Sequence, residues 1–228
     1  MAEPVDTRLH FHAELGRLEE QTLGALDMVG VTLNRVMEAL HHQDIELAGL
    51  VILDDDRIDG RYLEVQQGIL SLLARQAPVA TDLRLVAGLL HVIRHAERMG
   101  DQCVNVAKLL PITGNQPPVQ QELLDRVEEM GRYAVSQVAQ SKRAFELRDV
   151  ELAEDLVRQD VRLNQLNREC FQLAVDLGTE ADVREWTLTM MLVARALERI
   201  GDNAVDIGEQ VAFVVTGLFR EFSDASHR

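Results

Sequence analysis

The chain has 228 residues, of which 46% are hydrophobic and only 4% are aromatic, and its formal net charge at pH 7 is −15. This length can bury a sizeable core in one or two domains, and the abundance of Leu, Ala, Glu, Arg and Gln favours helices over strands. The negative charge argues against a nucleic-acid partner, because binding to a phosphate backbone depends on clustered Lys and Arg. We therefore predict an all-α protein whose partners are cations or basic surfaces.

Apolar residues recur at helical spacing over residues 7–42, which predicts a long first helix. A short turn follows, with Asp44 as the N-cap of a second helix predicted over residues 45–76. Pro78 interrupts the helical pattern and predicts a tight hairpin, after which a third helix is expected over residues 81–110. The first half of the chain should therefore form three antiparallel helices.

The second half repeats the first. Residues 111–118 form the only stretch rich in Pro and Gly, and residues 144–153 beyond it align with residues 39–48 at an offset of 105. Gly178 lies where the Pro78 hairpin would recur. We predict six long antiparallel helices in two tandem, sequence-related three-helix bundles. The predicted divisions are residues 1–112 for the first bundle, 113–118 for the linker and 119–228 for the second bundle.

A short acidic motif occurs once in each half. Residues 97–101, Glu-Arg-Met-Gly-Asp, return at residues 198–202 as Glu-Arg-Ile-Gly-Asp, and a third oxygen-bearing side chain follows as Asn105 or Asp206. Residues four apart lie on one face of a helix, so each copy forms an acidic row. Like charges at this spacing destabilise an isolated helix by about 0.2–0.5 kcal/mol per pair. The rows therefore predict a bound cation.

The second predicted helix carries its own acids, including Asp55 and Asp59. Counted from the hairpin at about 1.5 Å per residue, they lie level with the acids of the 97–101 motif on the third helix. Two acidic rows at one height can converge on one site. The offset of 105 carries this arrangement onto Asp160 and Asn164, so the second site is weaker by one charge.

The helical phase leaves an alternative open. If Cys103 belongs to the buried stripe of the third helix, Glu97 and Asp101 lie at its far edge, as boundary or surface residues of a purely solvated acidic face. Gly100 and Gly201 stand beside the rows, although a glycine costs about 0.5–1 kcal/mol relative to alanine in a helix interior. One use for that cost is the close approach of a ligand or a neighbouring helix.

The two cysteines, Cys103 and Cys170, match no metal-thiolate or redox spacing. They predict buried free thiols in a reducing compartment. No apolar run approaches the roughly 18–20 residues of a membrane span, and the acidic, polar N-terminus does not resemble a signal peptide. We therefore expect a cytoplasmic protein.

Residues 76–86, Gln-Ala-Pro-Val-Ala-Thr-Asp-Leu-Arg-Leu-Val, together with the duplicated Glu-Arg-x-Gly-Asp motif, resemble the PhoU family of phosphate-signalling accessory proteins. The resemblance covers about residues 7–217. It implies a pair of three-helix bundles, each with an acidic surface site for a multinuclear metal cluster. It also implies a negative regulator that links the phosphate ABC transporter ATPase to a sensor histidine kinase, and no enzymatic activity. Association with the membrane would then be peripheral, through these partners, and a homodimer is one option for the oligomeric state.

The resemblance implies bound divalent or trivalent metal ions, and the metal could be Fe, Zn, Mn, Ni or Mg. Two departures from the family pattern weaken the prediction that the middle helix of the second half contributes ligands. Asn164 stands where an acid is expected, and Glu185-Trp186 replaces the Arg84-Leu85 of the first half. The implied ligands are Asp55, Asp59, Glu97, Asp101 and Asn105 in the first half, and Asp160, Asn164, Glu198, Asp202 and Asp206 in the second.

Two other classes of protein stay open from the sequence. A ferritin-like di-metal protein also sets carboxylates on facing helices, but it requires Glu-x-x-His pairs that point into a bundle core. No such pair lies near these rows. The other alternative is a helical adaptor that binds partner proteins and no metal.

Overall fold

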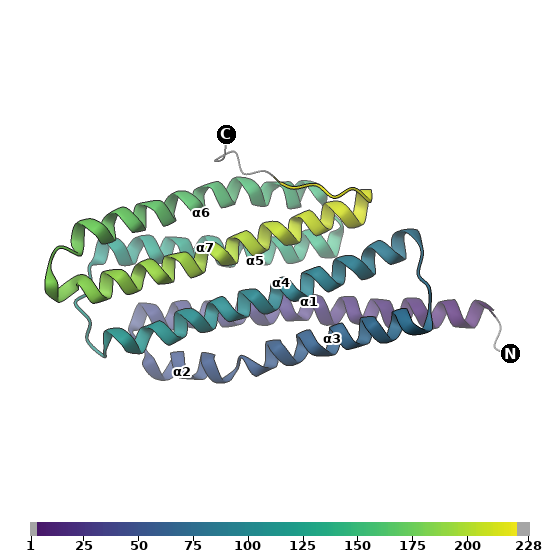
Figure 1. The fold of residues 1–228 in the computed structure, drawn as a ribbon, viewed down its shortest axis with the longest axis horizontal. Coiled ribbons are helices and arrows are strands. Elements are labelled where there is room, and N and C mark those ends of the chain that lie inside the picture. The colour runs from purple at the N-terminus through teal and green to yellow at the C-terminus, as the bar shows by residue number, and fades with distance from the viewer. Residues whose placement is uncertain (1–3, 223–228) are drawn as a thin grey trace.

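The computed structural model describes residues 4–222, and every regular element within them is a helix. This confirms the predicted all-α fold. The helices run along the long axis of an elongated molecule (Figure 1). They are α1 (Pro4–His42), α2 (Ile45–Leu53), α3 (Asp56–Arg75), α4 (Ala80–Leu109), the 3₁₀ helix η1 (Leu110–Thr113), α5 (Gln121–Leu147), α6 (Val150–Leu177) and α7 (Ala181–Thr216).

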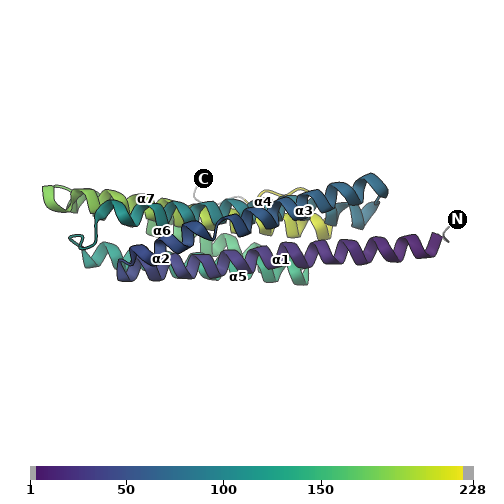
Figure 2. The same ribbon diagram turned by 90° about the horizontal axis from the view of Figure 1, so that it is seen from below.

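The helices divide into two units of three rods. The first unit contains α1, the α2–α3 pair and α4, and the second contains α5, α6 and α7. Helix α4 packs on α7 and α1 packs on α5, so α4 and α7 lie in one layer and α1 and α5 in another (Figure 2). The buried apolar side chains of both units form one continuous core. Residues 114–120 connect the units outside any helix, and the division into domains at residues 1–112 and 119–228 with a linker at 113–118 stays a prediction.

The second predicted helix differs from the structure. It is interrupted by a turn at residues 54–55, which separates α2 from α3 and changes the direction of the rod (Figure 2). Acids crowd this segment, and Asp54 leaves the helical row to form an ion pair with Arg35 at 2.7 Å. In α6, Gln159 and Val161 replace two of these acids, and that helix is continuous. Repulsion between neighbouring carboxylates explains why the middle rod is interrupted in the first unit and continuous in the second.

The start of the middle rod is built in the same way in both units. The Asp44 carboxylate accepts a hydrogen bond from the backbone N–H of Leu47 at 2.9 Å, and Asp149 caps α6 through Leu152 at 3.0 Å. Each carboxylate satisfies an N–H group that the first helical turn leaves without a partner. The equivalence of the two caps agrees with the predicted offset of 105 residues.

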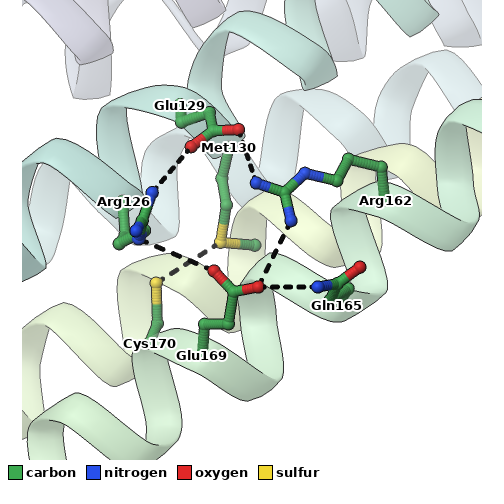
Figure 3. Close-up of polar contacts among 7 residues, drawn as sticks. All are labelled: Arg126, Glu129, Met130, Arg162, Gln165, Glu169 and Cys170. Atoms are coloured by element: carbon green, nitrogen blue, oxygen red, sulfur yellow. Dashed lines mark hydrogen bonds and ion pairs between the residues drawn. The ribbon is translucent and has the colours of Figure 1, made fainter.

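Both cysteines are buried free thiols, as predicted. Burial raises the pKa of Cys103 and of Cys170 to about 12, so both thiols are protonated and unreactive near neutral pH. The Cys170 sulfur lies 3.8 Å from the sulfur of Met130, next to a set of charged side chains on α5 and α6 (Figure 3). Within residues 4–222, no helix is both long and apolar enough to cross a membrane.

Candidate functional site

The second acidic site is an open pocket between α6 and α7. Its volume is about 490 Å³. All five residues that the sequence predicts for the second site line it, together with Arg168 and Arg195 from the same two helices. The structure therefore brings the predicted ligands of the two rows to one place. They are Asp160, Asn164, Glu198, Asp202 and Asp206.

Glu198 is the most enclosed acid of the α7 row. Only 8% of its surface is exposed, and one carboxylate oxygen accepts a hydrogen bond from Arg195. The other oxygen, Oε2, is buried and has no hydrogen-bond partner among the described residues. Burial raises the pKa of Glu198, and the neighbouring charge of Asp202 raises it further. A buried carboxylate oxygen of this kind is costly unless a positive group completes its environment.

Asp160 and Asn164 form the α6 side of the pocket. Asp160 is 6% exposed, and its Oδ2 atom accepts a hydrogen bond from the Asn164 amide at 2.7 Å. An acid at position 164 would repel Asp160, whereas an amide donates a hydrogen bond to it. The departure at Asn164 therefore relieves charge in this part of the pocket.

The glycines beside the two rows allow neighbouring helices to approach closely. A Cβ atom on Gly201 would lie 2.4 Å from Leu163 Cδ2 and 3.2 Å from Asp160 Oδ1, both on α6. In the first unit, a Cβ atom on Gly100 would lie 3.0 Å from Ile58 Cδ1 on α3. The missing side chain at each glycine thus lets the neighbouring helix approach closely. This close approach keeps the facing acids of each unit near one another.

The first acidic site is more exposed, and its carboxylates interact through their charges. Burial raises the pKa of Asp55, Glu97 and Asp101, and the charge of Asp59 raises each of the three further. These four acids therefore lie close enough to repel one another, although they come from both sides of the α3–α4 hairpin. Asn105, the fifth predicted residue, is exposed on α4.

The acidic side chains of each site lie near one another, but they do not surround a single point. Across the described part of the chain, no three Asp, Glu, His or Cys side chains converge tightly enough to hold an ion in their present rotamers. Like charges separate unless a cation lies between them. A bound ion would therefore require side-chain rotation in these rows, which the exposed and half-buried carboxylates, unlike the buried Asp160 and Glu198, can make at low cost.

A group of charges on α5 and α6 provides a contrast within the same unit. Arg162 lies 2.8 Å from Glu129 and 3.2 Å from Glu169, and Arg126 contacts the same two glutamates (Figure 3). The hydrogen bond from Arg162 lowers the pKa of Glu129. Two positive and two negative side chains neutralise one another there. In the acidic rows the carboxylates outnumber their cationic partners, so those rows retain a net negative charge.

Sequence reasoning missed one acid of the second pocket, Glu209. It lines the pocket on α7, three residues after Asp206, and thus continues the row of acids along one face of the helix. This spacing was a visible signal. In the first unit the equivalent position, at the offset of 101 between the two motifs, is Lys108, whose charge lowers the pKa of Asp55 and of Asp101. The two rows therefore end in opposite charges.

Comparison with known proteins places this architecture in one family. The PhoU domain profile matches residues 23–110 and 127–211, one match in each unit. A phosphate-specific transport system accessory protein PhoU homolog 1 of Mycobacterium leprae is 30% identical over 220 residues, which covers 94% of this chain and 96% of that protein.

Two solved structures share the fold. Phosphate transport system regulatory protein PhoU of Streptococcus pneumoniae superposes with a TM-score of 0.84 at 25% identity, over 92% of this chain and 99% of that one. PhoU of Pseudomonas aeruginosa gives a TM-score of 0.86 at 27% identity, over 91% of this chain and 100% of that one. With both PhoU domain matches falling on the two acidic units, the chain belongs to the PhoU family.

Proposed function

We propose that the protein is an accessory regulator of phosphate transport. The relative in Mycobacterium leprae is described as an accessory protein of the phosphate-specific transport system, and the structure from Streptococcus pneumoniae as a regulatory protein of phosphate transport. The match of both units to the PhoU domain, with nearly complete coverage of each relative, is the observation that carries this proposal. The protein would act as a negative regulator of phosphate uptake and of the phosphate-starvation response.

The proposed partners are the ATPase of a phosphate ABC transporter and a sensor histidine kinase. The protein would reach the inner face of the membrane through them, from the cytoplasm. The pKa of about 12 for both buried cysteine thiols argues against either cysteine as a nucleophile.

We also propose that the acidic rows bind metal ions, with one site in each unit. The proposed ligands of one or more ions are Asp55, Asp59, Glu97, Asp101 and Asn105 in the first unit, and Asp160, Asn164, Glu198, Asp202 and Asp206 in the second. The buried Oε2 atom of Glu198 supports this, because a cation would complete its environment. Oxygen ligands suit Mg and Mn, and Fe and Zn accept them as well. A bound ion would neutralise the row and link the two helices that face it.

A ferritin-like di-metal enzyme is a weaker alternative. Such a site lies in the core of a four-helix bundle and uses histidines from Glu-x-x-His pairs. Here the pocket opens to the surface between two helices, and the described residues that line it include no histidine. A helical adaptor without metal would use the same fold and is separated from the metal proposal by experiment.

Deletion of the gene tests the regulatory role. A strain without the protein should express its phosphate-starvation genes in high phosphate, and the full-length protein supplied from a plasmid should restore repression. A deletion strain that keeps these genes repressed and takes up phosphate at the normal rate would contradict the proposal.

Elemental analysis tests the metal sites separately. Untagged protein, purified without nickel resin, should contain Fe, Zn, Mn or Mg in amounts that fall when the acidic rows are neutralised. Matched variants exist in the two units: Glu97→Gln with Asp101→Asn, and Glu198→Gln with Asp202→Asn. Metal content that is the same in wild type and in the combined variant would favour the adaptor.

A further inference from the structure

The chain beyond α7 turns back along the helix that precedes it. Gly217 has a φ of +76°, a left-handed conformation that glycine adopts without strain, and it ends α7. The Phe219 ring then stacks on Phe213 at a centroid distance of 4.2 Å. The backbone N–H of Phe222 donates a hydrogen bond of 2.7 Å to the Glu209 carboxylate. Figure 1 shows this segment, residues 217–222, running back from the end of α7.

Residues 217–222, the C-terminal segment, form part of the wall of the acidic pocket. Phe222 lines that pocket, and a Cβ atom on Gly208 would lie 3.3 Å from its ring, so the ring rests directly on α7. Glu209 lines the acidic pocket and also a second cavity of about 520 Å³, which residues 219–221 of the segment line as well. Glu209 thus lines the pocket and is also hydrogen-bonded to the C-terminal segment.

Glu209 lies on the face of α7 that carries the rest of the acidic row. Its distance in sequence from Glu198, Asp202 and Asp206 is eleven, seven and three residues, all of which are same-face spacings on a helix. The carboxylate is half-buried, and its pKa is raised by burial and by the charges of Asp206 and Glu221. The Phe222 N–H acts in the opposite direction and stabilises the charged form.

The first unit lacks both features. Lys108 occupies the position equivalent to Glu209, and after α4 the chain continues through η1 toward α5. An ammonium group at that position repels a cation, whereas a carboxylate attracts one. The two units therefore differ at the end of the row, and the first serves as an internal control for the second.

We propose that Glu209 is a further cation-binding residue of the second site and that residues 217–222 are a lid whose position depends on site occupancy. When a divalent cation is bound, Glu209 exchanges its hydrogen bond with the Phe222 N–H for the ion, and the segment is released from α7. By linkage, whatever releases the segment must also tighten cation binding. The inference rests on the proposed cation site of the second unit.

Hydrogen–deuterium exchange of the Phe222 amide in the full-length protein, with and without Mn²⁺, tests this directly. Isothermal titration in parallel measures how tightly Mn²⁺ binds. In wild type, saturation with Mn²⁺ should speed exchange of this amide about tenfold, which corresponds to the loss of about 1.4 kcal/mol of protection. Glu97→Gln with Asp101→Asn, which alters only the first site, should leave that response unchanged.

Variants at Glu209 and Phe222 test the lid separately from the cation site. Glu209→Gln keeps an oxygen that accepts the Phe222 N–H but has no charge. It should bind Mn²⁺ about tenfold more weakly, and its Phe222 amide should not respond to the ion. Phe222→Pro removes the donor N–H and should tighten binding, whereas Phe222→Ala keeps the N–H and serves as its control for the loss of the ring.

The outcomes distinguish the lid from the metal site. Binding of Mn²⁺ that depends on Glu198 and Asp202, without faster exchange at Phe222, would overturn the lid and leave the site intact. Equal Mn²⁺ affinity of wild type and Glu209→Gln would overturn the role of Glu209. If Mn²⁺ does not bind the second unit at all, the proposed metal function fails and the lid fails with it.

Discussion

The His95 imidazole of α4 lies 3.5 Å from the Asp206 carboxylate of α7, measured from Nδ1 to Oδ2. The same nitrogen lies 2.8 Å from the side-chain oxygen of Asn203, and only 8% of the His95 surface is exposed. Asp206 also lines the second acidic pocket, so a buried residue of the first unit contacts a site of the second. At the offset of 101, the residue equivalent to His95 is Ala196, so the repeat does not duplicate this imidazole.

The contact predicts a stability effect at the interface of the units. His95→Ala should lower the free energy of unfolding by about 1–3 kcal/mol, because it leaves a cavity and removes the partner of the Asn203 oxygen. Urea denaturation followed by circular dichroism measures this. His91→Ala, at an exposed position on the same helix, is the control and should change stability by less than about 0.5 kcal/mol. Equal stability of the two variants would show that the imidazole contact contributes nothing.

Neutralising the α7 row should not weaken the metal-free protein. Glu198→Gln with Asp202→Asn removes the repulsion between two neighbouring acids, so the variant should melt at the same temperature as wild type or higher when metal is chelated. Wild type should gain about 2.7 kcal/mol from an ion at a hundredfold excess over its Kd, and the variant should gain less. Differential scanning calorimetry with and without Mn²⁺ measures both effects. A melting temperature of wild type that no metal shifts would contradict the site.

The pH dependence of stability should report the buried Glu198 carboxylate. Its pKa in the folded protein is raised above the usual 4.5, first by burial and then by Asp202. The folded state therefore binds this proton more tightly than the unfolded state. Its contribution to stability is complete below about pH 4.5 and is lost as the pH rises through the folded pKa.

The Glu198→Gln variant has no titratable group at this position. In the absence of metal it should therefore gain stability relative to wild type as the pH rises from about 4.5 towards neutrality. Glu97→Gln should change in the same direction, because burial also raises the pKa of Glu97. Urea denaturation across this range measures the difference. A difference that stays constant, or that grows as the pH falls, would be the opposite result.

The close approach of α6 and α7 at Gly201 predicts an overpacking effect. A Cβ atom there would lie 2.8 Å from Gln137 Oε1 as well as within contact of Leu163, so Gly201→Ala should cost about 1–3 kcal/mol of stability. Gly30→Ala is the matched control. Gly30 lies within α1 with open space around it, and the alanine there should stabilise the protein by about 0.5–1 kcal/mol. Equal effects of the two substitutions on urea denaturation would show that the helices can separate freely.

Helical periodicity in the sequence was sufficient to predict most of the fold. The spacing of apolar residues, the Asp44 cap and the Pro78 hairpin are local features, and local features decide where helices begin and end. The break at residues 54–55 was not predicted, although the acids that cause it are visible in the sequence. Whether a crowded acidic stretch stays helical depends on the partners it finds elsewhere, here Arg35 of α1.

The candidate sites, like the fold, could be predicted from the sequence only in part. The duplicated motif and the four-residue spacing determined that the acids form rows, because side chains four apart on a helix share a face. Only the packing of distant helices decided that Glu198 is buried while its counterpart Glu97 is half-exposed, that His95 reaches Asp206, and that Glu209 holds the C-terminal segment. These contacts join residues from different elements or from beyond a helix end, where short-range periodicity carries no information about which side chains meet.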